Sequence, residues 1–159
     1  MMNGSQFRSP IPDEKANATA AILQPLLIDM TDLSLLLKHA HWNVRGALFQ
    51  PLHQQLDLIV DTAREASDEI AERIVMLGHP ADGLVQSIAA GTSLNPLHKR
   101  FLPTQEVIEE ISNRIHRVIE SLRNAIDSTG ELDSVTQDIL IGISGPLEKH
   151  LWMLQSQQL

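Results

Sequence analysis

The feature that most constrains the fold is a set of four long segments in which apolar residues recur every three or four positions. This spacing places the apolar side chains on one face of an α-helix, and that face must be buried against other helices. The expected helical segments are 15–44, 51–78, 104–129 and 134–154. Short connections follow the first and third segments, whereas the long stretch 79–103 follows the second. We therefore predict an all-α four-helix bundle with one long crossover loop.

Punctuating residues predict where these helices begin and end. Gly46 is expected to end the first helix, and Pro51 suits the first turn of the second. Thr104 is the expected N-cap of the third helix, and Ser134 with Gln137 matches a capping box that opens the fourth. Within the crossover loop, the weakly apolar stretch 84–89 predicts a short helix.

Two prolines interrupt otherwise helical patterns. Pro25 predicts a kink or a late start of the first helix, because proline cannot donate a backbone hydrogen bond and its ring crowds the preceding turn. Pro146 falls inside the fourth helix and predicts the loss of one backbone hydrogen bond there.

The chain is expected to form one domain. Its 159 residues suffice for a single core. Residues 1–14 lack an apolar period and predict a mobile arm, which leaves 15–159 as the bundle domain. The start of the chain has no signal-peptide core, and no uninterrupted apolar run is long enough to cross a bilayer. We expect a cytoplasmic protein without a membrane partner.

Composition narrows the kind of ligand that the chain can bind. The sequence has no cysteine, so any metal must be held by nitrogen and oxygen atoms of His, Asp and Glu. The formal net charge of −8 attracts small cations and repels nucleic acid. A metal partner is therefore favoured over DNA.

The second helix carries two pairs of such residues at i, i+4 spacing, His53 with Asp57 and Asp68 with Glu72. Either pair alone is most often a solvated helix surface. At about 100° per residue, however, all four positions fall on one face of the helix. Asp57 and Asp68 are 11 residues apart, which is about 16 Å along the axis, so one metal ion cannot touch both within one chain.

The two pairs are arranged symmetrically about the midpoint between Thr62 and Ala63. An antiparallel second copy of the helix, related by a twofold axis at that midpoint, would bring His53 opposite Glu72 and Asp57 opposite Asp68. It would also bring Asp61 opposite Arg64, an attractive pair. Any two equally spaced pairs have this symmetry, so the pattern permits a dimer without proving it.

Outside the second helix, several residues also need to be weighed between a functional and an ordinary interpretation. His41, near the end of the first helix, can supply another imidazole, although a histidine beside Trp42 is more often a packed or surface residue. His39 is expected to be a surface residue. Trp42 and Trp152 have packing as their ordinary interpretation. Asp127, Glu131, Asp133 and Asp138 have ordinary interpretations as surface and capping residues.

The sequence around these residues resembles the Dps family, the ferritin-like cages named as DNA-binding proteins from starved cells. The resemblance is carried by KHAHWNVRG at 38–46, LHQQLD at 52–57 and SDEIAERIVMLG at 67–78. Weaker similarity runs from about Ala18 to the end, including DIL at 138–140 and EKHLWM at 148–153. The positions of His41, His53, Asp57, Asp68 and Glu72 match the ferroxidase ligands of that family.

The resemblance implies a ferritin-like fold and a dodecameric shell built from twofold dimers. In each inter-subunit site, His41, His53 and Asp57 of one subunit would face Asp68 and Glu72 of its mate and hold two irons. Asp68 and Glu72 would bind the first iron, while Asp57 and His41 would hold or bridge a second, weaker one. The family oxidises ferrous iron, preferably with hydrogen peroxide, stores the ferric product inside the shell, and requires no organic cofactor.

The resemblance also implies functional roles for residues outside the five ligands. In such proteins an indole near the site donates an electron to a stray oxidant, which is the alternative to packing for Trp42 and Trp152. Acidic residues near this region line an iron entry pore in the family, which is the alternative to a surface or capping role for Asp127, Glu131, Asp133 and Asp138.

Two other functions remain open from the sequence. One is a DNA-compacting protein, which the charge of the arm disfavours because Arg8 and Lys15 are balanced by Asp13 and Glu14. The other is a cage that stores metal without oxidising it efficiently.

Overall fold

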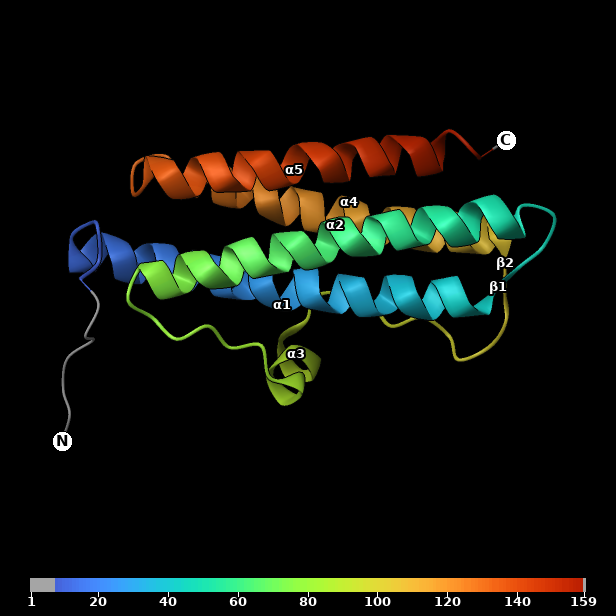
Figure 1. The fold of residues 1–159 in the computed structure, drawn as a ribbon, viewed down its shortest axis with the longest axis horizontal. Helices are drawn as coiled ribbons and strands as arrows, with labels where there is room; N and C mark the ends of the chain where they lie inside the picture. The colour runs from blue at the N-terminus through green and yellow to red at the C-terminus, as the bar shows by residue number, and fades with distance from the viewer. Residues whose placement is uncertain (1–7, 159) are drawn as a thin grey trace.

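Four long helices run side by side in the computed structural model, which describes residues 8–158 (Figure 1). In chain order, the elements are α1 (Asp13–Asn43), β1 (Val44–Arg45), α2 (Phe49–Met76), α3 (Val85–Gly91), β2 (Leu102–Pro103), α4 (Thr104–Thr129) and α5 (Ser134–Gln155). The all-α four-helix bundle with one long crossover, predicted from the apolar spacing, is confirmed.

The core lies along the shared axis of the four long helices. Leu and Ile side chains from all four helices fill it, and Met30, Leu33 and Leu37 of α1 are completely buried. Full burial of one such side chain contributes about 1.5–3 kcal/mol. Among the described residues, α1 alone has the length and hydropathy of a membrane-spanning helix, and 56% of its most apolar window is buried inside the bundle. Its apolar character is therefore explained by core packing.

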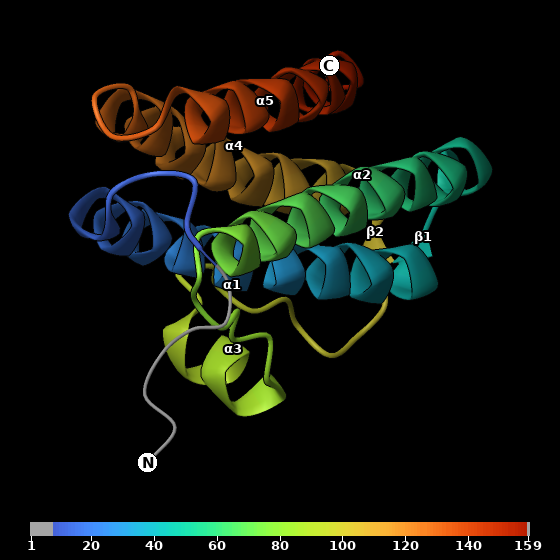
Figure 2. The same ribbon diagram turned by 60° about the vertical axis from the view of Figure 1, so that its left-hand side comes forward.

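The crossover between α2 and α4 carries the short helix α3 beside α1 (Figure 2). Two aspartates of α1 hold the loop after α3, because Asp29 accepts hydrogen bonds from the backbone N–H and hydroxyl of Ser93, and Asp32 accepts one from Thr92. Arg114 of α4 donates to the carbonyls of Asn95 and Pro96 from the other side. The loop is thus fixed to the bundle at both of its neighbouring helices.

A small parallel sheet, which the sequence patterns did not indicate, joins the α1–α2 turn to the end of the crossover. Val44 pairs with Leu102 in this two-stranded ladder. Gly46 then reverses the chain with a φ of +135°, a conformation that favours glycine, and a Cβ there would lie 3.0 Å from the Thr104 hydroxyl. The turn that places α1 against α2 therefore depends on glycine at this position.

Two expected helix caps are wrong by one residue. Thr104 is the first residue of α4, whose N-cap is Pro103 and has no side-chain capping bond. At α5, Asp133 rather than Ser134 is the cap, because its carboxylate accepts hydrogen bonds from the backbone N–H groups of Val135 and Thr136. Gln137 does not complete a capping box and instead donates to the Ile126 carbonyl.

The prolines inside helices are tolerated because they lie on exposed faces. Helix α1 begins at Asp13 and contains Pro25, so the late start considered for this helix is wrong. Pro146 lies within α5 as expected. Both prolines are exposed, as are Ala21 and Gly142 four residues before them, and water can therefore bond the carbonyls left without an N–H partner.

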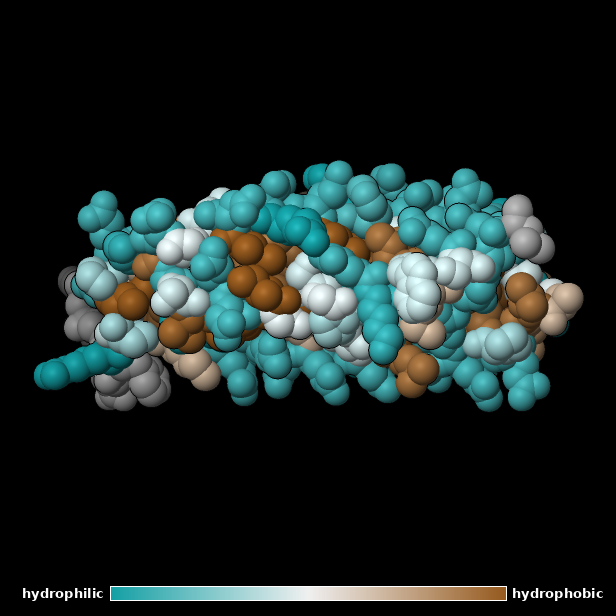
Figure 3. Space-filling view, turned by 90° about the horizontal axis from the view of Figure 1, so that it is seen from above, coloured by the Kyte–Doolittle hydropathy of each residue, from teal (hydrophilic) through white to brown (hydrophobic). Residues whose placement is uncertain are grey.

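The proposed mobile arm, residues 1–14, overlaps the described residues only in part. Residues 1–7 lie outside them, while Asp13 and Glu14 belong to the first turn of α1. The division into an arm and a bundle domain stays a prediction. The face on the α5 side of the bundle is largely hydrophilic, with separate hydrophobic patches (Figure 3).

Candidate metal centre

The two predicted histidine ligands meet where α1 ends and α2 begins. His41 lies in the last turn of α1, and His53 lies just past the first turn of α2. Their rings stack with centroids 3.6 Å apart and an angle of 18° between the planes. The side chain of His41 is 8% exposed, so His41 is the ring of the stack that packs against the bundle. The structure thus brings together two imidazoles that are 12 residues apart in sequence.

Each of these histidines is held by the backbone of the other. Nδ1 of His41 lies 2.8 Å from the carbonyl oxygen of His53, and Nδ1 of His53 lies 2.8 Å from the carbonyl oxygen of His41. Because a carbonyl oxygen can only accept, both Nδ1 atoms must carry hydrogen. In the neutral rings Nε2 then keeps its lone pair, which is the tautomer that a metal ligand requires.

Asp57 joins the histidines one turn further along α2. Its Oδ1 lies 3.3 Å from Nδ1 of His41 and 2.5 Å from Nζ of Lys38, and its side chain is 46% exposed. The hydrogen bond from Lys38 has the largest effect and lowers the pKa of Asp57. Burial opposes it, while the charge of Lys38, and those of the histidines when they are protonated, lower the pKa further, so that the net change is downward. Asp57 is therefore an ionised, accessible carboxylate already neutralised by a cation.

Asp68 and Glu72 stand apart from this cluster. Both lie on α2 and are exposed, and at the rise of an α-helix Asp68 lies about 16 Å and Glu72 about 22 Å further along the helix than Asp57. Among residues 8–158, no group of three or more His, Asp or Glu side chains gathers closely enough to hold a metal ion. One chain therefore presents the five predicted ligands as two incomplete sets, which we call the histidine half (His41, His53, Asp57) and the acidic half (Asp68, Glu72).

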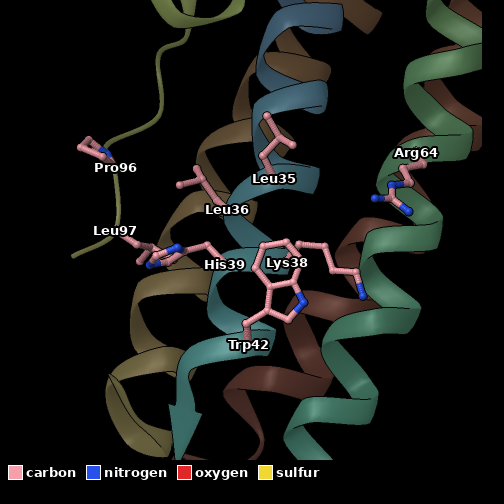
Figure 4. Close-up of a pocket in the computed structure, with 8 residues that line it drawn as sticks. All are labelled: Leu35, Leu36, Lys38, His39, Trp42, Arg64, Pro96 and Leu97. Atoms are coloured by element: carbon pink, nitrogen blue, oxygen red, sulfur yellow. The ribbon is translucent and has the colours of Figure 1, made fainter. Parts of the chain in front are cut away.

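Exposed apolar side chains also lie on α1 and α2, the helices that carry the two halves. Leu35 and Trp42 of α1 and Leu58 of α2 are 54%, 68% and 60% exposed. The first two line a hollow of about 420 Å³ together with Lys38, His39 and Arg64 (Figure 4). Large apolar side chains gathered on one face of a soluble protein mark a surface that binds another molecule.

The remaining sequence candidates fall into different roles. His39 is partly buried, and its Nε2 donates to the His98 carbonyl, which ties α1 to the crossover loop. The side chains of Trp152 and Trp42 are 64% and 68% exposed, so neither packs in the hydrophobic core of the single chain. Asp133, one of the four candidate pore acids, is buried and paired with Arg73, so it serves as a structural cap. Asp127, Glu131 and Asp138 are exposed.

Lys38 is a site residue that the sequence reasoning missed. It precedes His41 by three positions, and residues at i, i+3 share a face of a helix. The sequence signal for Lys38 was therefore this spacing. A lysine on the same helix face as His41 lies close to any carboxylate that binds beside that histidine, as Asp57 does.

Comparison with known proteins identifies relatives along almost the whole chain. The family model described as a ferritin-like domain matches residues 20–158. The "DNA protection during starvation protein" of Mycolicibacterium smegmatis is 35% identical, over 92% of this chain and 80% of that protein.

Solved structures agree with this relationship. A structure of Mycobacterium smegmatis Dps has a TM-score of 0.91 and 34% identity, covering 96% of this chain and 93% of that one. Dps from Microbacterium arborescens, solved in a "high iron form", has a TM-score of 0.88 and 37% identity, covering 93% and 96%. Both similarities cover more than nine-tenths of the chain.

Proposed function

This chain belongs to the Dps family of ferritin-like proteins, and we propose that it binds ferrous iron between two copies of itself and oxidises it. The preferred oxidant is hydrogen peroxide. The protein thereby removes two reactants that together damage DNA, in keeping with the protective role that its relatives' names state.

The observation that carries this proposal is the separation of a prepared histidine half from an acidic half. His41 and His53 hold each other in the metal-binding tautomer, yet only Asp57 joins them within the chain. Imidazole and carboxylate together suit ferrous iron, and incomplete coordination leaves positions for an oxidant. The carboxylates needed to complete the site are exposed at the other end of the same helix.

A second copy packed antiparallel on α2 would complete two equivalent sites. A twofold axis near Thr62 and Ala63 places the acidic half of each copy opposite the histidine half of the other. Asp61 and Arg64 are both exposed and would form a pair across this contact. The exposed Leu35, Trp42 and Leu58 supply apolar area for it. Further contacts between such dimers would build the dodecameric shell in which ferric product is stored.

Two irons in one site explain why peroxide is a safe oxidant. Each ferrous ion gives up one electron, and peroxide takes both as its O–O bond breaks. With two protons, the products are two ferric ions and two water molecules. A single iron would supply only one electron and release a hydroxyl radical, so the paired site determines the outcome.

Anaerobic addition of ferrous salt followed by peroxide tests the proposal. We expect Asp68→Asn and Glu72→Gln each to slow iron oxidation by about tenfold or more, since each removes a direct ligand. Glu69→Gln, a neighbouring exposed carboxylate outside the set, is the matched control and should keep the wild-type rate. Unchanged rates in both ligand variants would instead favour a cage that stores metal without efficient oxidation.

Relatives named for DNA protection make DNA binding the second candidate. The net charge of −8 opposes it, since affinity for DNA depends on neutralising phosphates with lysine and arginine. Gel retardation at low salt separates the two. We expect no shifted band at any protein concentration, and a salt-sensitive shift would establish DNA binding as an additional function.

A further inference from the structure

A third aromatic ring belongs to the histidine cluster. Phe49, the first residue of α2, places its ring centroid 5.0 Å from that of His53, with an angle of 31° between the planes. The i, i+4 spacing puts the two side chains on the same face of the helix. His53 therefore contacts a ring of α1, His41, and a ring of its own helix.

His53 needs such support more than His41 does. The side chain of His41 is buried, whereas His53 is only partly buried at the edge of the bundle. Rotation about the last torsion of a histidine is broad and roughly twofold, so a loosely held ring can flip, which exchanges Nδ1 with Cδ2 and Nε2 with Cε1. Such a flip would break the bond to the His41 carbonyl and redirect the lone pair that binds metal.

We propose that Phe49 is a positioning residue, whose ring holds the His53 imidazole in the orientation that presents Nε2 to iron. This inference rests on the proposed function of the site. The hydrogen bond to the His41 carbonyl selects one of the two ring orientations. The rings of His41 and Phe49 then narrow the range of angles that the His53 ring can adopt. Aromatic pairs in such offset arrangements are worth about 0.5–1.5 kcal/mol beyond the area they bury.

The location of Phe49 supports this role over that of a core residue. Its side chain is 43% exposed, so the ring contact with His53 is made at the surface rather than inside the bundle. Leu48, the adjacent N-cap residue, is exposed to a similar extent at 42% but has no aromatic ring to add to the stack. The pair offers a matched comparison, because both side chains are apolar, exposed and at the same helix terminus.

The test measures Co²⁺ binding, by visible absorption, to the assembled protein and its variants after their size has been checked by gel filtration. We expect Phe49→Leu to weaken Co²⁺ binding by about tenfold, at the lower end of the range for residues that orient metal ligands. Phe49→Tyr keeps the ring and should restore binding, and Leu48→Ala should bind as the wild type does.

Nitrogen-15 NMR of the imidazoles gives a second readout that a purely structural role would not change. In the wild type, His53 should show protonated Nδ1 and unprotonated Nε2, and in Phe49→Leu it should show a mixture of both tautomers. Wild-type Co²⁺ affinity with an unchanged His53 spectrum in Phe49→Leu would overturn the inference, as would equal losses in Phe49→Leu and Leu48→Ala. If the wild type itself bound no Co²⁺, the proposed function would fail, while the NMR comparison would still report whether Phe49 orients His53.

Discussion

His41 and His53 exchange hydrogen bonds, with Nδ1 of each ring 2.8 Å from the backbone carbonyl of the other. This exchange links the end of α1 to the start of α2 and sets the tautomer of both rings at the same time. Each histidine is consequently both a candidate ligand and the support of the other candidate ligand.

Mutual support predicts strongly non-additive effects of mutation. Removing either ring in His41→Ala or His53→Ala should lower Co²⁺ affinity by about tenfold or more, because one ligand is lost and the other is left without its orienting contact. The double variant should be little worse than either single variant, since residues that act as a unit give coupled free energies. Titration of the four proteins with Co²⁺ measures this coupling. Additive losses would show that the two rings act independently.

Lys38 should compete with metal for Asp57. Lys38→Met removes the cation that neutralises this carboxylate, and it should tighten Co²⁺ binding by about two- to fivefold, in line with the strength of exposed ion pairs. The pKa of Asp57 should rise towards its ordinary value, because the hydrogen bond that lowers it is gone. Carbon-13 NMR titration of the carboxylate measures the second effect. Lys99→Met, at an exposed lysine of the crossover loop, should change neither quantity.

The burial of His150 predicts that the protein loses stability in mild acid. Burial lowers its pKa, and the charge of Lys149 adds to the effect. Its Nε2 bonds the Thr62 hydroxyl, while its buried Nδ1 has no partner within the described chain. A histidine whose pKa is lower in the folded state takes up its proton more readily when unfolded, so stability falls as the pH drops below the ordinary value of 6.5. The free energy of unfolding, measured with denaturant between pH 7 and about 5, should change less with pH in His150→Gln than in the wild type. Equal slopes for the two proteins would exclude His150 as the cause.

Asp133 should matter for folding rather than for iron entry. Burial alone would raise its pKa, but hydrogen bonds from Thr136 and Arg73 outweigh that effect and lower it. Asp133→Ala leaves Arg73 buried without its partner and removes the α5 cap, so it should cost about 3–5 kcal/mol of unfolding free energy. The stabilisation is present above the ordinary pKa of 3.8 and is lost as the pH falls through the lower folded value. Asp138→Ala, at an exposed position on the same helix, should stay within about 0.5 kcal/mol of the wild type.

The sequence predicted the long elements well because apolar periodicity reports burial over many residues at once. Helix ends were less predictable, since the choice of Asp133 over Ser134 as a cap depends on Arg73, which is distant in sequence. The sheet of Val44 and Leu102 is too short to leave a pattern. In the candidate site, i, i+4 spacing identified residues that share a helix face. It did not reveal the exchange between His41 and His53, which forms only when α1 and α2 pack.

The most direct test asks whether the two halves of a site come from different chains. His53→Gln inactivates the histidine half and Glu72→Gln the acidic half, so each variant alone should oxidise iron very slowly. When the two are unfolded together and refolded, half of the dimers contain one of each, and in a twofold dimer such a pair has one intact site, so about a quarter of wild-type activity should return. If the mixed assembly stays as inactive as its parents, the two chains do not share the site and the proposed function is wrong.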